Sequence, residues 1–126
     1  MNENQIGDLI VEASISIHRK TGPGLLESVY ETILAHQLQA EGLTVKRQVY
    51  MPIQYDQITF ENGFRADLVI ENKVIVELKC VELISNSHRK QLLTYLRMTG
   101  MRLGYLLNFN ESLMKHGIYR TVNKLW

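Results

Sequence analysis

The stretch Phe64-Arg-Ala-Asp-Leu-Val-Ile-Glu-Asn-Lys-Val-Ile-Val-Glu-Leu-Lys-Cys80 consists of two runs rich in Val, Ile and Leu, joined by a short polar turn. Runs of this composition, bounded by Asn or Gly, predict two adjacent antiparallel strands. Because side chains alternate across a strand, Glu77 and Lys79 share one face of the second strand, opposite the apolar face that includes Leu78. The first strand contributes Asp67, and these three polar residues are the main functional candidates of the chain.

The length of the turn decides whether Asp67 lies beside Glu77. Directly opposed residues of an antiparallel pair point to the same face, so the two carboxylates meet only in the register that leaves a three-residue loop, residues 71–73. A two-residue loop would send Asp67 to the opposite face. We therefore predict the three-residue loop or a bulge, with Asn72 or Lys73 in a left-handed conformation.

Two carboxylates and an ammonium group on one face of otherwise apolar strands need a physical reason. Like charges a few ångströms apart repel each other unless a cation or a shared proton relieves them. Asp67 and Glu77 offer the oxygen ligands that Mg²⁺ or Mn²⁺ prefers. Lys79 would then orient or deprotonate a metal-bound water, or stabilise charge on an attacked phosphate. A solvated sheet face, on which these residues and Arg65 pair across strands, accounts for the same spacing.

The composition is that of an ordinary globular protein. A chain of 126 residues, 45% apolar and 21% charged, suits one domain over residues 1–126. The formal net charge of +1 neither requires nor excludes a nucleic-acid partner, since a local patch matters more than the total. The single Cys80 excludes an internal disulfide framework and a Cys-rich zinc site. With a polar start and no apolar run near ~20 residues, we expect a cytoplasmic protein without a membrane partner.

Two helices are expected before the central hairpin. Apolar residues at helical spacing predict a helix over residues 4–20, and a turn at residues 21–24 separates it from a second helix over residues 25–41. The expected core positions of the second helix are Leu26, Val29, Ile33 and Leu38. Glu27 lies in the first turn of that helix, where it either complements the positive helix end or contributes to a site.

The remaining segments complete an alternation of strands and helices. Turn residues are concentrated at 54–57 and 61–63. Further strands are expected at residues 43–51, 53–60, 102–109 and 117–122. The cap cluster Ser85-Asn-Ser87 predicts the start of a helix that is expected to run to Thr99 and to be ended by Gly100. On one face of it, at spacings of three and four, lie His88, Gln91 and Tyr95, and the last two either satisfy the sheet edge or face the carboxylates.

Several of these residues form motifs in a recognisable order. The segment Gly24-Leu-Leu-Glu27-Ser-Val-Tyr30 resembles the signature of the small bacterial GxxExxY proteins. Asp67, Glu77-Leu-Lys79 and Gln91-Leu-Leu-Thr-Tyr95 resemble the D…ExK and QxxxY motifs of the PD-(D/E)XK nuclease superfamily, in which that family is placed. The similarity extends over nearly the whole chain. Ala66 stands where the superfamily name has Pro, which matters little because this Pro ligates nothing.

The resemblance implies a fold and a set of roles. The fold would be an α/β restriction-endonuclease-like core, a mixed β-sheet flanked by helices in the order α-α-β-β-β-α-β-β. Asp67 and Glu77 would hold Mg²⁺ or Mn²⁺, with Glu27 as a further metal or water contact. Lys79 would assist the nucleophilic water. Two residues of the later helix would line the site and orient the phosphate or the lysine: Gln91 and Tyr95.

Three functions are open at this point. The first is a metal-dependent nuclease that hydrolyses phosphodiester bonds of DNA or RNA. The second is a catalytically silent nuclease-like module that binds nucleic acid or a protein partner. The third is a structural domain, and the long helices leave a homodimer open. A basic groove beside the site, expected to give salt-dependent binding, would come from Arg19, Lys20, Arg65, Arg89 and Lys90.

Overall fold

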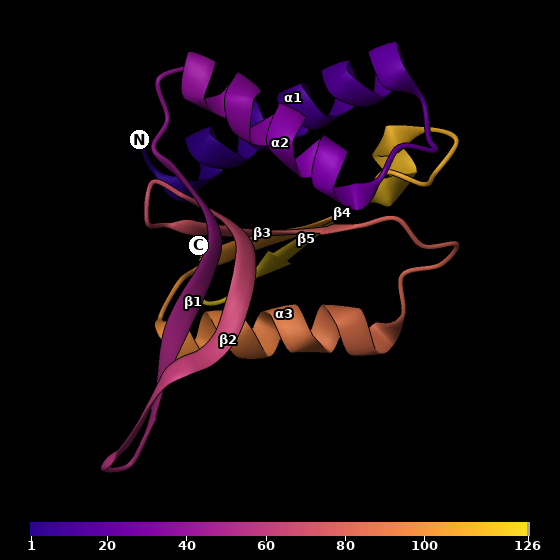
Figure 1. Cartoon of the computed structure of the whole chain (residues 1–126). Helices are drawn as coiled ribbons and strands as arrows, with labels where there is room; N and C mark the ends of the chain where they lie inside the picture. The colour runs from indigo at the N-terminus through magenta and orange to yellow at the C-terminus, as the bar shows by residue number, and fades with distance from the viewer. Residues whose placement is uncertain (126) are drawn as a thin grey trace.

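The computed structural model describes residues 1–125 and contains three helices and a five-stranded sheet (Figure 1). In chain order the elements are α1 (Glu3–Thr21), α2 (Glu27–Ala40), β1 (Val45–Tyr55), β2 (Ile58–Ile70), β3 (Val74–Lys79), α3 (Asn86–Thr99), β4 (Leu103–Asn108), the short 3₁₀ helix η1 (Met114–Gly117) and β5 (Ile118–Val122). This succession confirms the expected α-α-β-β-β-α-β-β order. Within the described part of the chain, none of the helices combines the length and hydropathy needed to cross a bilayer.

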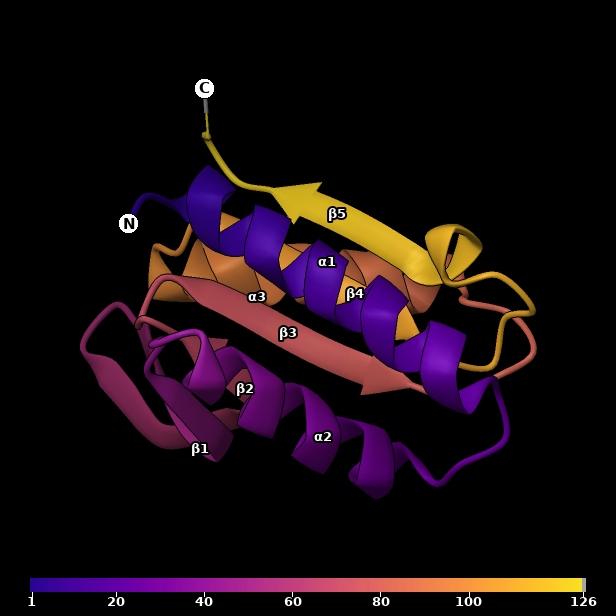
Figure 2. The same ribbon diagram turned by 90° about the horizontal axis from the view of Figure 1, so that it is seen from above.

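The sheet has the strand order β1-β2-β3-β4-β5 and is mixed. Only β3 and β4 pair in parallel, and α3 forms the crossover that a parallel connection requires. Helices α1 and α2 cover one face of the sheet and α3 covers the other (Figure 1). Seen from above, β5 lies at one edge and the β1–β2 pair at the opposite edge (Figure 2).

Strand β3 separates the two halves of the core. Its even-numbered residues Val74, Val76 and Leu78 pack in the cluster formed with α1 and α2, whereas Ile75 packs in the cluster formed with α3. A strand buried on both faces has no need of alternating polarity, which explains its near-continuous apolar sequence. The polar residues at its end, Glu77 and Lys79, therefore stand out from their surroundings and lie on the α3 side.

The hairpin between β2 and β3 has the predicted register. Ile70 pairs with Val74, so the loop spans residues 71–73, and the amide of Lys73 donates to the carbonyl of Ile70 at 2.9 Å. The left-handed residues are Glu71 and Asn72, each with φ 53°. The prediction for Asn72 is confirmed, while Lys73 has no left-handed backbone.

The expected strand boundaries before this hairpin were wrong, although the turn between the two strands falls within the predicted turn residues 54–57. Strand β1 continues through Pro52 to Tyr55, the turn lies at residues 56–57, and β2 runs through the segment 61–63 that was expected to be a turn. The two strands form an arm that extends past α3 (Figure 1). In the sequence Gly63 suggests a turn, but in the structure it allows β2 to pack closely on Ile53. A Cβ at this position would lie 2.5 Å from the Ile53 side chain.

The core face of α2 also differs from the expectation. Leu26 and Val29 are 73% and 38% exposed, whereas Tyr30 and Leu34 are fully buried. Of the other two expected positions, Leu38 is buried and Ile33 packs at the margin of the core. The helix begins only at Glu27, and its buried residues recur at intervals of four from Tyr30. Leu26 is its N-cap and precedes the packed surface.

Candidate active site

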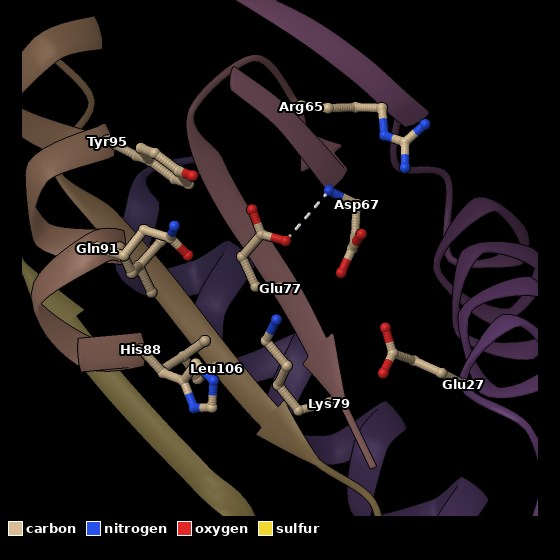
Figure 3. Close-up of a pocket in the computed structure, with 10 residues that line it drawn as sticks. Glu27, Arg65, Asp67, Glu77, Lys79, His88, Gln91, Tyr95 and Leu106 are labelled. Atoms are coloured by element: carbon tan, nitrogen blue, oxygen red, sulfur yellow. Dashed lines mark hydrogen bonds between the residues drawn. The ribbon is translucent and has the colours of Figure 1, made fainter. Parts of the chain in front are cut away.

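A cavity of about 150 Å³ opens between the sheet, the start of α2 and the N-terminal half of α3 (Figure 3). At roughly 30 Å³ per water molecule, this volume has room for an ion and a few waters. Ten residues line it: Glu27, Arg65, Asp67, Glu77, Lys79, His88, Gln91, Leu92, Tyr95 and Leu106. All six residues nominated from the sequence are among them.

The strands β2 and β3 bring Asp67 and Glu77 to the same side of the sheet. The backbone amide of Asp67 donates to Oε2 of Glu77 at 3.4 Å, the contact drawn in Figure 3. Asp67 in turn accepts from two donors: the amide of Leu78 reaches its Oδ2 at 2.9 Å, and Nε2 of Gln48 reaches its Oδ1 at 3.3 Å. The aspartate carboxylate is thereby held in one orientation beside Glu77.

Gln48 lies across from Asp67 on the neighbouring strand β1 and has an unusual backbone. Its φ is 49°, and it is not among the paired residues of β1 and β2, although its neighbours Arg47 and Val49 pair with Leu68 and Ala66 in one register. At the same place β2 changes its packing, because Ala66 is buried on the α3 side and Leu68 on the α1–α2 side. A non-glycine residue in this region is strained, and such strain persists only where the surroundings impose it.

The side chain of Gln48 continues a hydrogen-bonded network toward α2. It donates to Oε1 of Glu31, a carboxylate that is only 7% exposed. Arg47 pairs with Oε2 of the same glutamate at 3.1 Å and also donates to Thr32. The buried charge of Glu31 is therefore compensated, and the network ties the position of Asp67 to the body of α2.

Glu77 is in an electrostatically unfavourable position. Burial, followed by repulsion from Asp67, raises the pKa of the Glu77 carboxyl to about 9, against 4.5 for the free side chain. Its Oε1 is buried and has no hydrogen-bond partner among the described residues. A buried oxygen without a donor is costly, and a divalent cation in the cavity would supply both the missing contact and the compensating charge. This oxygen-only pair fits Mg²⁺ or Mn²⁺.

The alternative of a solvated face with charges paired across strands is wrong. Within residues 1–125, the only ion pair shorter than 4.0 Å joins Arg47 and Glu31. Neither Lys79 nor Arg65 pairs with the carboxylates, although both line the same cavity. Their amine and guanidinium remain available to a ligand that enters the cavity.

Helix α3 supplies the wall opposite Glu27. Its N-cap Ser85 accepts from the amide of His88, which confirms the expected start of the helix, and Gly100 ends it in a left-handed conformation. Figure 3 shows Gln91 and Tyr95 on the Glu77 side of the cavity, so of the two sequence alternatives they face the carboxylates. Burial, and next the charge of Glu77, raises the pKa of the Tyr95 hydroxyl, which keeps it a hydrogen-bond donor.

Glu27 enters the cavity from the start of α2 (Figure 3). Burial, and next repulsion from Asp67, raises the pKa of its carboxyl. The loop before it is anchored by Tyr30, whose hydroxyl donates to the carbonyl of Gly22 and accepts from the amide of Leu25. The described residues contain no group of three or more His, Cys, Asp or Glu side chains arranged for a metal. The role of Glu27 as a further metal contact therefore stays a prediction.

Three polar residues of the site, Arg65, His88 and Gln48, were not nominated for it. The sequence placed His88 on the helix face of Gln91 and Tyr95, and Arg65 in the expected basic groove, but it gave neither residue a role in the cavity. No pattern in the sequence indicated that Gln48 belongs to the site.

The architecture and the site agree with one known family. A model of the PD-(D/E)XK nuclease superfamily matches residues 4–121, which includes every residue that lines the cavity. A search of curated proteins gave no match. The mixed sheet flanked by helices is the restriction-endonuclease-like core expected of that family. The chain belongs to the PD-(D/E)XK nuclease superfamily.

Proposed function

We propose that this protein is a metal-dependent nuclease that hydrolyses phosphodiester bonds of DNA or RNA. The single observation that supports it most is the unpartnered, buried Oε1 of Glu77 beside Asp67 in a cavity that also contains Lys79. A scaffold would have no reason to keep two carboxylates together at this cost.

The role of each residue in the cavity follows from its chemistry. Asp67 and Glu77 would hold Mg²⁺ or Mn²⁺, with Glu27 within the same cavity as a further contact. A bound divalent ion of this kind polarises a phosphate and lowers the pKa of bound water. Lys79 would orient the attacking water or donate to a phosphate oxygen as negative charge develops there.

The wall of α3 would position the substrate. The Gln91 amide and the Tyr95 hydroxyl are hydrogen-bond donors that point at the same space, and they would orient the phosphate or Lys79. The Tyr95 ring is fixed by stacking on Phe64, with ring centroids 3.7 Å apart. A rigid donor loses little entropy when it binds a phosphate.

Within the superfamily, we assign the chain to the GxxExxY group, because Gly24, Glu27 and Tyr30 stand at that spacing. We further infer that residues 1–126 act as one cytoplasmic domain. A chain this short has little surface for sequence readout, so specific recognition would need a homodimer or a partner.

Melting curves with and without Mg²⁺ or Mn²⁺ test the metal site. A ligand that binds only the folded state raises its apparent stability, and this effect should disappear in Asp67→Ala and Glu77→Ala. Cleavage of single- and double-stranded DNA and RNA should be abolished by Lys79→Ala with the fold retained. Metal binding without cleavage of any substrate would refute the enzyme and leave the nuclease-like binding module.

A further inference from the structure

Although the net charge is only +1, basic and acidic residues are distributed very unevenly along the chain. Residues 83–125 contain seven lysines and arginines against one acidic residue, Glu111. Residues 1–82 contain seven against twelve. The helix α3 contains no acidic residue at all. A protein whose total charge is near zero therefore carries a strongly positive region built from α3 and the strands that follow it.

Five exposed cations of this region, which we call the basic face, lie on α3 and in the segments next to it: Arg89, Lys90, Arg97, Arg102 and Lys124. They line two surface depressions. The first lies between α3 and β5 and is lined by Arg89 and Lys90; Arg120 of β5 also borders it, but its guanidinium donates to Oδ1 of Asn4 on α1 at 2.8 Å. The second lies at the C-terminal end of α3 and is lined by Arg97, Arg102 and Lys124. Among residues 1–125, no carboxylate lines either depression.

The basic face differs from the groove that the sequence suggested. Arg65 lines the catalytic cavity, while Arg19 lies at the end of α1 beside η1 and shares no depression with the cations of α3. The strand β5 stands at the sheet edge opposite the β1–β2 pair (Figure 2). Of the five expected groove residues, only Arg89 and Lys90 belong to the basic face.

The basic face adjoins the catalytic cavity through the first turns of α3. His88 lines the cavity, and Arg89, the next residue, lies on the β5 side with its guanidinium 5.4 Å from the Tyr119 ring centroid. From Arg89 to Gly100 the helix rises about 17 Å at 1.5 Å per residue. At about 3.4 Å per phosphate along one duplex strand, this length matches roughly five phosphates.

We propose that the basic face binds the sugar-phosphate backbone of the nucleic acid whose cleavage takes place in the cavity. The inference rests on the proposed nuclease function. It assigns substrate retention to residues that do not enter the cavity, so affinity and catalysis are separable by mutation. Lysine and arginine contacts to phosphate release counterions without reading bases, and the binding is therefore sequence-independent and salt-dependent.

Two triple variants with equal charge change test the inference. The face variant is Lys90→Gln, Arg97→Gln, Arg102→Gln. The control variant is Arg19→Gln, Lys20→Gln, Lys46→Gln, which removes three exposed cations from α1 and β1. Binding of fluorescent single-stranded and duplex DNA and RNA of 20 nucleotides is measured by anisotropy between 50 and 300 mM salt without divalent metal, so cleavage does not interfere.

The face variant should lose on the order of 100-fold in affinity for its best ligand at about 0.1 M salt, with a salt slope reduced by about 2 to 3. The control should lose much less. In cleavage assays the face variant should raise KM with little change in kcat. Equal losses in the two variants would overturn the inference, as would tighter binding to phosphatidylserine vesicles than to any nucleic acid.

The two proposals fail in different ways. Face-dependent binding of nucleic acid without cleavage by the wild-type chain would refute the enzyme and retain the basic face as a binding surface. Cleavage that depends on Lys79 but has the same KM in the face and control variants would retain the enzyme and refute the basic face.

Discussion

Replacement of Glu77 by Gln should change how the stability of the metal-free protein depends on pH. The unfolded carboxyl ionises near 4.5, whereas burial and the neighbouring Asp67 raise the pKa of the folded group to about 9. Between these values the folded state holds a proton that the unfolded state has lost. The free energy of unfolding therefore falls as pH rises, by about 1.4 kcal/mol per unit.

From pH 6 to pH 8 this amounts to about 2–3 kcal/mol for the wild type. Glutamine has nearly the same shape as glutamate and does not titrate, so the Glu77→Gln variant should lack that part of the slope and be the more stable protein at pH 8. Urea unfolding in EDTA at pH 6, 7 and 8, followed by circular dichroism, measures the difference directly.

Added divalent metal should counteract the loss of stability that is expected for the wild type as pH rises. A divalent ion must displace the proton of Glu77, so its affinity should rise with pH up to about 9, and added Mg²⁺ should restore stability most at pH 8. Parallel pH slopes for wild type and Glu77→Gln in EDTA would refute the electrostatic account of the site. A metal response that survives Glu77→Gln undiminished would refute the role of this carboxylate as a ligand.

Three further substitutions probe the surroundings of the site. Gln48→Ala removes a donor to Asp67 and should weaken Mg²⁺ binding by about 10- to 100-fold in calorimetry; an unchanged affinity would show that Leu78 alone orients the aspartate. Tyr30→Phe leaves the Gly22 carbonyl without its buried donor and should cost about 1–2 kcal/mol in denaturant unfolding. Gly63→Ala places a Cβ against Ile53 and should cost about 1–3 kcal/mol, which a second change, Ile53→Ala, should partly restore.

The parts of the fold that the sequence predicts are those governed by local rules. The loop at 71–73 follows from strand parity once Asp67 and Glu77 are required to share a face, and the α3 boundaries follow from a Ser cap and a Gly end. The face of α2 is a tertiary choice. The apolar residues of this helix are spread around it, so their spacing alone does not single out the buried side. The hydrogen bond from the Tyr30 hydroxyl to the carbonyl of Gly22 favours burial of the side that carries Tyr30 and Leu34.

The β1–β2 arm could not be predicted from periodicity because little of it is buried. Tyr55, Ile58 and Phe60 are more than half exposed, so the apolar alternation that marks a core strand has no core to face. Pro52 stands where the register of the two strands shifts, between Met51 and Ile53, which lets a proline occupy a position inside a strand. Strand propensity alone therefore predicts that a strand ends at this proline.

The orientation of Asp67 depends on a feature that no short-range rule describes. The hairpin register places Asp67 beside Glu77, but β2 must also turn its packing from the α3 side at Ala66 to the α1–α2 side at Leu68. The left-handed backbone of Gln48 accommodates this change of side, in a conformation that a glycine would adopt without strain. Glycine, however, could not donate to both Asp67 and Glu31. The strain at Gln48 is thus retained because the same residue that permits the bend also holds the carboxylate at the site.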